Sequence, residues 1–187
     1  MDREAINSDV HERLLVVQSQ TRDPGAFREL VARYESRMVY YIRRMIGDST
    51  DAYDVMQEVW ILVFSRLSTL QAPEAFRVWL YRIAHDVAVS HLRRRTRRPQ
   101  PMSDEVDFSQ EVEEWDEMQA LDNAELVHRT LEQLSPTHRE VLTLRFLEEL
   151  ELADIAEVVG CEIGTVKSRL HYAKRSLREQ IEGANDE

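Results

Sequence analysis

The strongest constraint on the fold of this chain lies near its end, in residues 152–178. Two segments with helical apolar spacing flank a short break at Gly160. In the second segment Val166, Leu170, Ala173 and Leu177 form a narrow stripe along one face of a helix. A glycine readily adopts the left-handed backbone that often ends a helix. The pattern therefore predicts two helices joined by a tight turn, a helix-turn-helix.

The outer face of the second predicted helix is basic. Residues 164–178 contain five Lys or Arg and no Asp or Glu, although the net charge of the chain is −11. A solvated surface helix in so acidic a protein should carry both signs. We therefore interpret the segment as a DNA recognition helix rather than as an ordinary basic face. The residues opposite the apolar stripe are Gly164, Ser168, His171, Tyr172 and Arg175, with Lys167 beside them.

Composition excludes several classes of protein. Five glycines and five prolines in 187 residues leave little room for sheets and turns, so a mostly helical fold is expected. A single cysteine excludes internal disulfides and cysteine-rich zinc sites. No apolar run approaches the ~20 residues of a membrane span, and the N-terminus lacks the build of a signal peptide. We therefore expect a cytoplasmic protein that does not insert into a membrane.

Charge also divides the chain. Residues 99–124 contain nine Asp or Glu and no Lys or Arg, which predicts an acidic linker over residues 99–120. The predicted fold is all-α, with two small helical domains, residues 1–98 and 121–187, joined by this linker. Helices are expected at residues 10–20, 26–46, 51–67, 75–95, 121–134 and 138–147, before the helix-turn-helix.

The third predicted helix has a polar face. Asp54, Gln57 and Glu58 lie at i, i+3 and i+4, which brings them together on one side. A metal site would need a further ligand that the sequence does not supply nearby. A solvated face and a protein-docking face both remain open. The apolar residues of this helix are Val55, Val59, Leu62 and Phe64.

The fourth predicted helix combines aromatic residues such as Trp79 with arginines, and ends in five arginines within residues 93–98. Aromatic faces beside a basic ridge suit unpaired bases and their phosphates. A solvated helix end, favoured by the helix dipole, is the alternative. His85 and Asp86 raise the hypothesis of a metal hydrolase, but no second His/Asp cluster accompanies them. With no phosphate-binding loop or nucleophile motif, we predict no catalytic residue, cofactor or metal.

Several stretches together resemble a known family. DVMQE at residues 54–58 and the VWILVFSRL after it resemble the region-two helix of bacterial RNA polymerase sigma factors. FRVWLYRIAHDVAVSHLRRR at residues 76–95 resembles the adjoining promoter-melting helix. LEQLSPTHREVLTLRFLEEL at residues 131–150 and the helix-turn-helix after it, with its GTVKSRL, resemble region four. With both regions and a short linker, the chain resembles an extracytoplasmic-function (ECF) sigma factor.

The resemblance implies a promoter-specificity subunit of RNA polymerase that is not itself an enzyme. Its implied partners are core polymerase, through the β′ clamp and β flap, and promoter DNA, with an anti-sigma factor as a further candidate. Asp54, Gln57 and Glu58 would dock on the β′ clamp coiled coil. The implied contacts to the melted −10 element are Leu70, Gln71, Trp79, Arg82, Asp86, Arg93 and Arg94. The implied contacts to the −35 element are Arg145, Thr165, Lys167, Ser168, His171, Tyr172 and Arg175.

Three points stay open at this level. The family commonly has Gly-Leu-Ser before the helix-turn-helix, where this chain has Glu149-Leu150-Glu151. A stand-alone helix-turn-helix regulator remains the alternative function, although the docking face and the aromatic-arginine helix favour a sigma factor. Three roles are open for the acidic linker. It is a solvated tether, it mimics nucleic acid in the polymerase channel, or it folds back on the basic helix and blocks DNA binding.

Overall fold

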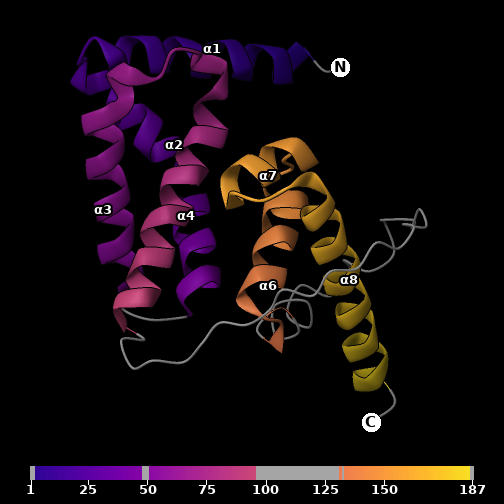
Figure 1. Ribbon diagram of the computed structural model, residues 1–187. Helices are drawn as coiled ribbons and strands as arrows, with labels where there is room; N and C mark the ends of the chain where they lie inside the picture. Colours follow the sequence, from indigo (N-terminus) through magenta and orange to yellow (C-terminus); the bar gives the residue numbers. More distant parts are fainter. Residues whose placement is uncertain (1–2, 48–50, 96–130, 132, 186–187) are drawn as a thin grey trace. The chain divides into compact units, whose positions relative to one another are not determined.

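The computed structural model describes residues 3–47, 51–95, 131 and 133–185 (Figure 1). Every regular element within these residues is helical, which confirms the all-α prediction. The chain divides into two compact units, Met1–Arg95 and Thr96–Glu187. The predicted linker and most of the helix predicted over residues 121–134 lie outside the described residues. No helix in the described ranges has the length and apolar character needed to span a membrane.

The first unit is a helical bundle. In Figure 1, α2, α3 and α4 run alongside one another, and α1 crosses their upper end. Two short 3₁₀ turns, Leu67–Thr69 and Pro73–Ala75, lead from α3 to α4. The helices are α1 (Arg3–Gln20), α2 (Pro24–Ile46), α3 (Asp51–Arg66) and α4 (Phe76–Arg95).

The core of this unit is aromatic as well as aliphatic. The rings of Tyr34 and Phe76 meet edge to face at 5.6 Å between centroids, and those of Tyr41 and Tyr81 at 5.2 Å. All four side chains are buried. Such pairs add to the stabilisation from burial itself, so they fix α2 against α4.

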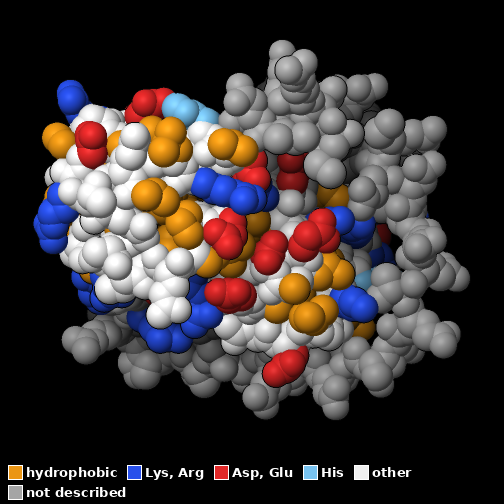
Figure 2. Space-filling model, turned by 90° about the horizontal axis from the view of Figure 1, so that it is seen from above, with side chains coloured by type: hydrophobic (Ala, Val, Ile, Leu, Met, Phe, Trp, Pro, Cys, Tyr) orange, Lys and Arg blue, Asp and Glu red, His pale blue; other side chains and the backbone are white. Residues whose placement is uncertain are grey.

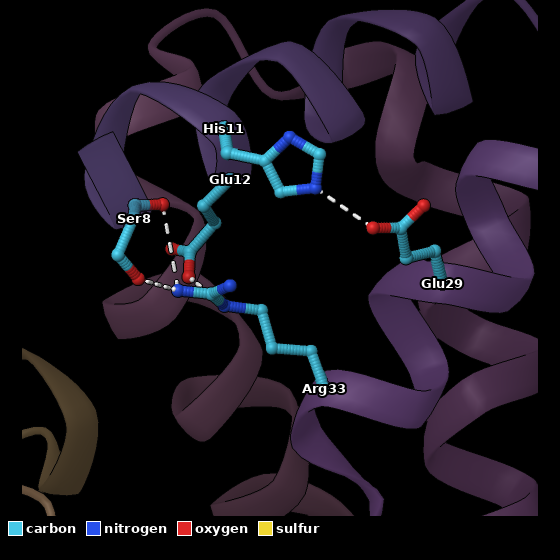
Figure 3. A network of polar contacts seen from close by, with 5 residues as sticks. All are labelled: Ser8, His11, Glu12, Glu29 and Arg33. Atoms are coloured by element: carbon cyan, nitrogen blue, oxygen red, sulfur yellow. Dashed lines mark hydrogen bonds and ion pairs between the residues drawn. The ribbon is translucent and has the colours of Figure 1, made fainter. Parts of the chain in front are cut away.

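The start of α1 is held by polar contacts (Figure 3). Arg33 on α2 donates from Nε to Glu12 Oε2 at 3.0 Å and also contacts the hydroxyl of Ser8. His11 Nε2 lies 2.7 Å from Glu29 Oε1. The helix begins at Arg3, before the predicted residue 10. These contacts to α2 are polar, so they leave no apolar periodicity in the sequence.

The second unit contains α6 (Pro136–Leu142), a π-helical turn (Thr143–Leu147), α7 (Leu152–Val159) and α8 (Ile163–Asn185). Ser135 caps α6 by accepting a hydrogen bond from the His138 amide at 3.4 Å. The helix predicted over residues 138–147 is correct in place but changes to π geometry in its second half. In this wider π-helical turn the Glu148 amide donates to the carbonyl of Thr143, five residues earlier, at 3.1 Å.

The apolar pattern of α3 was only partly predictive. Val55 and Val59 are buried, as expected, together with Trp60 and Val63. Leu62 is only half-buried, and Phe64 is 47% exposed. The list of apolar residues therefore does not show which of them are buried, because α3 carries apolar residues around most of its circumference.

Candidate functional site

The exposed face of α3 mixes acidic and apolar side chains. Asp54, Gln57 and Glu58 are all exposed, as their spacing predicts. Ile61 and Phe64 lie on the same side of the helix and are 62% and 47% exposed. The face opposite is packed into the bundle. A face with large apolar residues beside carboxylates is typical of a protein-binding surface rather than of a merely solvated helix.

Exposed apolar residues also occur elsewhere in the first unit. On α1, Val10, Leu14 and Val17 are about half exposed. Figure 2 shows one face of the molecule, on which apolar side chains lie among acidic and basic ones. Single apolar residues on a surface are ordinary. The combination with a carboxylate pair is what distinguishes α3.

An ion pair links α3 to the arginine run of α4. Arg94 Nη2 lies 3.2 Å from Glu58 Oε2, and both side chains are about half exposed. Nearby, His91 Nε2 lies 3.4 Å from Asp51 Oδ2. Arg93 is exposed at the same helix end. The structure therefore brings Glu58, predicted to dock on protein, next to Arg94, predicted to contact DNA.

The loop between α3 and α4 is anchored by Gln20, at the end of α1. Its side-chain amide donates to the carbonyls of Leu67 and Leu70, at 3.1 and 2.6 Å. Leu70 is half-buried, whereas Gln71 is exposed. Sequence reasoning missed Gln20, since no local pattern ties residue 20 to a loop 50 residues later.

The outer side of α4 presents an aromatic residue beside charged ones. Trp79 is half-buried, with its ring centroid 6.1 Å from that of the buried Phe76. Arg82 and Asp86 are exposed and their charged groups lie 4.0 Å apart, one helical turn from each other. The half-buried tryptophan has one part fixed in the bundle and another part open to solvent.

The helix-turn-helix forms as predicted. Gly160 ends α7 in the left-handed conformation, with φ of 64°. Of the predicted apolar stripe of α8, Val166, Leu170 and Ala173 are buried, and Leu177 is half-buried. Before α7, Glu149 also has a positive φ, 51°, a conformation better suited to the glycine common in the family.

The outer face of α8 carries a compact group of aromatic and basic residues. His171 and Tyr172 meet edge to face at 5.5 Å between centroids. The guanidinium of Arg175 lies over the Tyr172 ring at 5.2 Å, and Ser168 bonds its hydroxyl to the carbonyl of Gly164. The exposed members of the predicted −35 set are Thr165, Lys167, His171 and Arg175; Ser168 and Tyr172 are half-buried.

Arg145 differs from the other predicted DNA contacts. Its Nη1 donates to the carbonyl of Leu150 at 3.0 Å and lies 3.4 Å from Glu151 Oε1. These contacts hold the turn before α7. Glu151 itself makes no side-chain cap at the start of that helix.

Cys161 lies in the turn between α7 and α8. Burial raises the pKa of its thiol, and the nearby guanidinium of Arg169, with Nη1 3.9 Å from Sγ, opposes this shift. The neutral thiol is therefore favoured. Within the described residues, no group of three or more His, Cys, Asp or Glu is arranged to hold a metal ion.

Comparison with known proteins identifies the family. The model for Sigma-70 region 2 matches residues 30–98, and that for Sigma-70 region 4 matches residues 124–177. The chain is 36% identical over 182 residues to the RNA polymerase sigma-H factor of Pseudomonas aeruginosa, spanning 91% of this chain and 94% of that protein. The chain belongs to the sigma-70 family. This sigma factor therefore directs transcription by binding core RNA polymerase and promoter DNA.

Its relatives include members of the ECF group, and the chain is of this type. It is 29% identical over 187 residues to the ECF RNA polymerase sigma-E factor of Escherichia coli K12, covering 95% of this chain and 97% of that protein. The fold is shared with CnrH, solved in complex with the cytosolic domain of CnrY (TM-score 0.66, 24% identity, 92% of this chain and 98% of that one). It is also shared with RpoE of Bartonella quintana, solved with the anti-sigma factor NepR (TM-score 0.65, 23% identity, 83% and 96%).

Proposed function

We propose that the two halves of this sigma factor divide its work as the family resemblance implies. Residues 1–98 dock on core polymerase and melt the −10 element, residues 121–187 recognise the −35 element, and residues 99–120 link them. The observation that carries this proposal is the exposed face of α3, where Asp54, Gln57 and Glu58 lie beside large apolar residues.

Docking uses that face of α3 against the β′ clamp coiled coil. The carboxylates of Asp54 and Glu58 pair with basic side chains of the coiled coil, and Ile61 and Phe64 supply apolar contact area. Charges of this kind orient the encounter and raise its rate, while the apolar residues lower the rate of dissociation.

Melting uses α4 and the loop before it. The half-buried Trp79 offers a rigid ring on which an unpaired base stacks, and Gln71 lies exposed on the loop that Gln20 anchors. Arg93 and Arg94 neutralise phosphates of the melted strand. Stacking on one aromatic residue is worth roughly 1–3 kcal/mol per base. The loop and ring together therefore favour single-stranded −10 DNA.

Recognition of the −35 element uses α8 in the major groove. Its outer face offers a serine, a histidine and a tyrosine at its centre and lysines and arginines around them. Side chains at the centre read base edges, and the surrounding cations neutralise phosphates. Ser168 and His171 are therefore assigned to base reading, and Lys174 and Arg178 to backbone contact.

Three further proposals concern the molecule as a whole. The protein acts as a binding subunit with no catalytic residues of its own, since its family is one of transcription initiation factors. It works in the cytoplasm, where bacterial polymerase transcribes. An anti-sigma factor regulates it, since RpoE, which shares this fold, was solved in complex with the anti-sigma factor NepR.

Reconstitution with core polymerase tests this proposal. Glu58→Lys places a cation against a basic partner and should weaken core binding by more than tenfold, measured by fluorescence anisotropy. Glu35→Lys makes the same charge change at an exposed position of α2 and should bind as the wild type does. Unchanged binding by Glu58→Lys would disprove the docking assignment.

A further inference from the structure

The turn between α1 and α2 holds an arginine in an unfavourable backbone conformation. Arg22 has φ of 65°, in the left-handed region that glycine occupies without cost. Its amide donates to the carbonyl of Ser19 at 3.0 Å, and the amide of Asp23 donates to that of Gln18 at 3.2 Å. These two bonds complete a helix C-cap in which glycine is the ordinary residue. The turn itself therefore does not account for an arginine at this position.

That side chain reaches the exposed face of α3. The guanidinium carbon of Arg22 lies 5.5 Å from the centroid of the Phe64 ring, at cation-π distance. Phe27, on the first turn of α2, meets the same ring edge to face at 5.1 Å. Phe64 nevertheless remains 47% exposed. The ring is thus held in place by two neighbours and still open to a partner.

Arg22 completes a graded surface. On one side of α3 the exposed residues include acidic ones near the N-terminal end, Asp54 and Glu58, and large apolar ones further on, Ile61 and Phe64. Arg22 adds a cation beside the last of these, although it comes from a different helix junction. We call this surface the docking strip; its members are Arg22, Asp54, Gln57, Glu58, Ile61 and Phe64.

We propose that Arg22 is a core-binding residue, which pairs with an acidic side chain of the β′ clamp coiled coil while its guanidinium rests on Phe64. This inference rests on the proposed docking function of α3. The partner that fits the strip is a helix with basic residues at one end, apolar residues in the middle and an acidic residue at the other end.

The physical chemistry favours arginine in this role. A guanidinium stacks its flat face on a ring and still directs N–H donors outward from its edge, which an ammonium cannot do. The two backbone bonds hold the turn, and the contact with Phe64 restricts the side chain before the partner arrives. Less conformational entropy is therefore lost on binding.

Substitution of Arg22 separates binding from folding. Arg22→Gly removes the side chain and relieves the left-handed strain, so the thermal midpoint of the full chain should equal or exceed that of the wild type. Core binding, measured by fluorescence anisotropy, should weaken about tenfold, which corresponds to about 1.4 kcal/mol. Arg22→Lys keeps the charge without the flat stacking group, so its core affinity should lie between those of the wild type and Arg22→Gly.

Two controls make the outcome decisive. Arg28→Gln removes an equal charge from an exposed position of α2 and should leave core affinity unchanged. Glu58→Lys tests the docking face itself. Wild-type affinity of Arg22→Gly, or an equal loss in Arg28→Gln, would overturn the inference while leaving the α3 assignment intact. Unchanged binding by Glu58→Lys would instead refute the proposed function.

Discussion

The hydrogen bonds from Gln20 to the α3–α4 loop lead to predictions for both the stability of the protein and promoter opening. Gln20→Ala removes the donor that serves the carbonyls of Leu67 and Leu70, at 3.1 and 2.6 Å. Each of these two hydrogen bonds contributes about 1 kcal/mol net, or somewhat less where solvent has access, so the free energy of unfolding should fall by about 1–2 kcal/mol. For a unit of this size the thermal midpoint should fall by roughly 4–8 °C per kcal/mol.

The functional effect should be specific to one step. The loop is proposed to act on melted −10 bases, so a loosened loop should lower permanganate reactivity of the −10 thymines in the open complex. Core affinity should fall less than −10 reactivity, because Asp54 and Glu58, the carboxylates proposed to dock, lie in the first half of α3, although Arg22 of the docking strip lies only two residues from Gln20. The assays are thermal unfolding of the full chain, anisotropy with core polymerase, and permanganate footprinting of the holoenzyme.

Gln18→Ala is the matched control. Gln18 belongs to the same last turns of α1 but its side chain is exposed, so the substitution should change none of the three: the thermal midpoint, the core affinity or the −10 reactivity. A Gln20→Ala variant with a wild-type midpoint would refute the anchoring argument. A lowered midpoint with normal −10 reactivity would refute the role of the loop in capturing bases.

Three further predictions concern stability and recognition. Burial, and then the carboxylate of Glu12, raise the pKa of Tyr34 above its ordinary value, so the unfolded state loses this proton first as pH rises. The stability that neutral Tyr34 contributes is complete below pH ~10 and declines above it. In urea unfolding, Tyr34→Phe should therefore reduce the loss of unfolding free energy at alkaline pH. An unaltered loss would show that ionisation of Tyr34 is not its cause. Glu149→Gly should raise the free energy of unfolding by about 1 kcal/mol in the same assay by relieving its left-handed backbone; a loss of stability would show that the side chain outweighs the strain. In selection from randomised −35 duplexes, His171→Ala should change the preferred sequence, whereas Lys174→Ala should weaken all sequences alike with a shallower salt dependence, and the reverse result would exchange their roles.

The parts of the fold that were predictable from sequence depend on local chemistry. The caps at Asp23 and Ser135 are short polar side chains placed directly before a helix, and both accept hydrogen bonds from the helix start. Gly160 adopts the left-handed conformation that its position predicts. The helix-turn-helix was predictable for the same reason, since its apolar spacing and its glycine lie within one continuous segment.

The docking strip was only half predictable. The spacing of Asp54, Gln57 and Glu58 identifies a polar face, but the sequence of α3 does not say which of its apolar residues face the bundle. Phe64 falls at an apolar position and is nevertheless exposed. Only the packing of α2 and α4 against α3 decides this, because those helices select which side of an almost uniformly apolar helix is covered.

Contacts between distant segments were not predictable. Gln20 bonds to a loop about 50 residues later, and Arg22, in the turn between α1 and α2, lies over the ring of Phe64 on α3. Neither residue belongs to a periodic pattern or a motif. Their roles follow from how α1 crosses the end of the bundle, which is a property of the tertiary structure alone.

The two arginines Arg94 and Arg145 show why basic residues cannot be assigned to DNA by sequence alone. Arg94 pairs with Glu58 through side chains that are both about half exposed, and such a pair is worth only about 0–1 kcal/mol. A phosphate can therefore replace Glu58 at little cost. Arg145 is 29% exposed and donates to the backbone carbonyl of Leu150, in the turn that leads into α7. To contact DNA with the same N–H it would have to release that turn, so Arg94 is the better candidate for a phosphate contact.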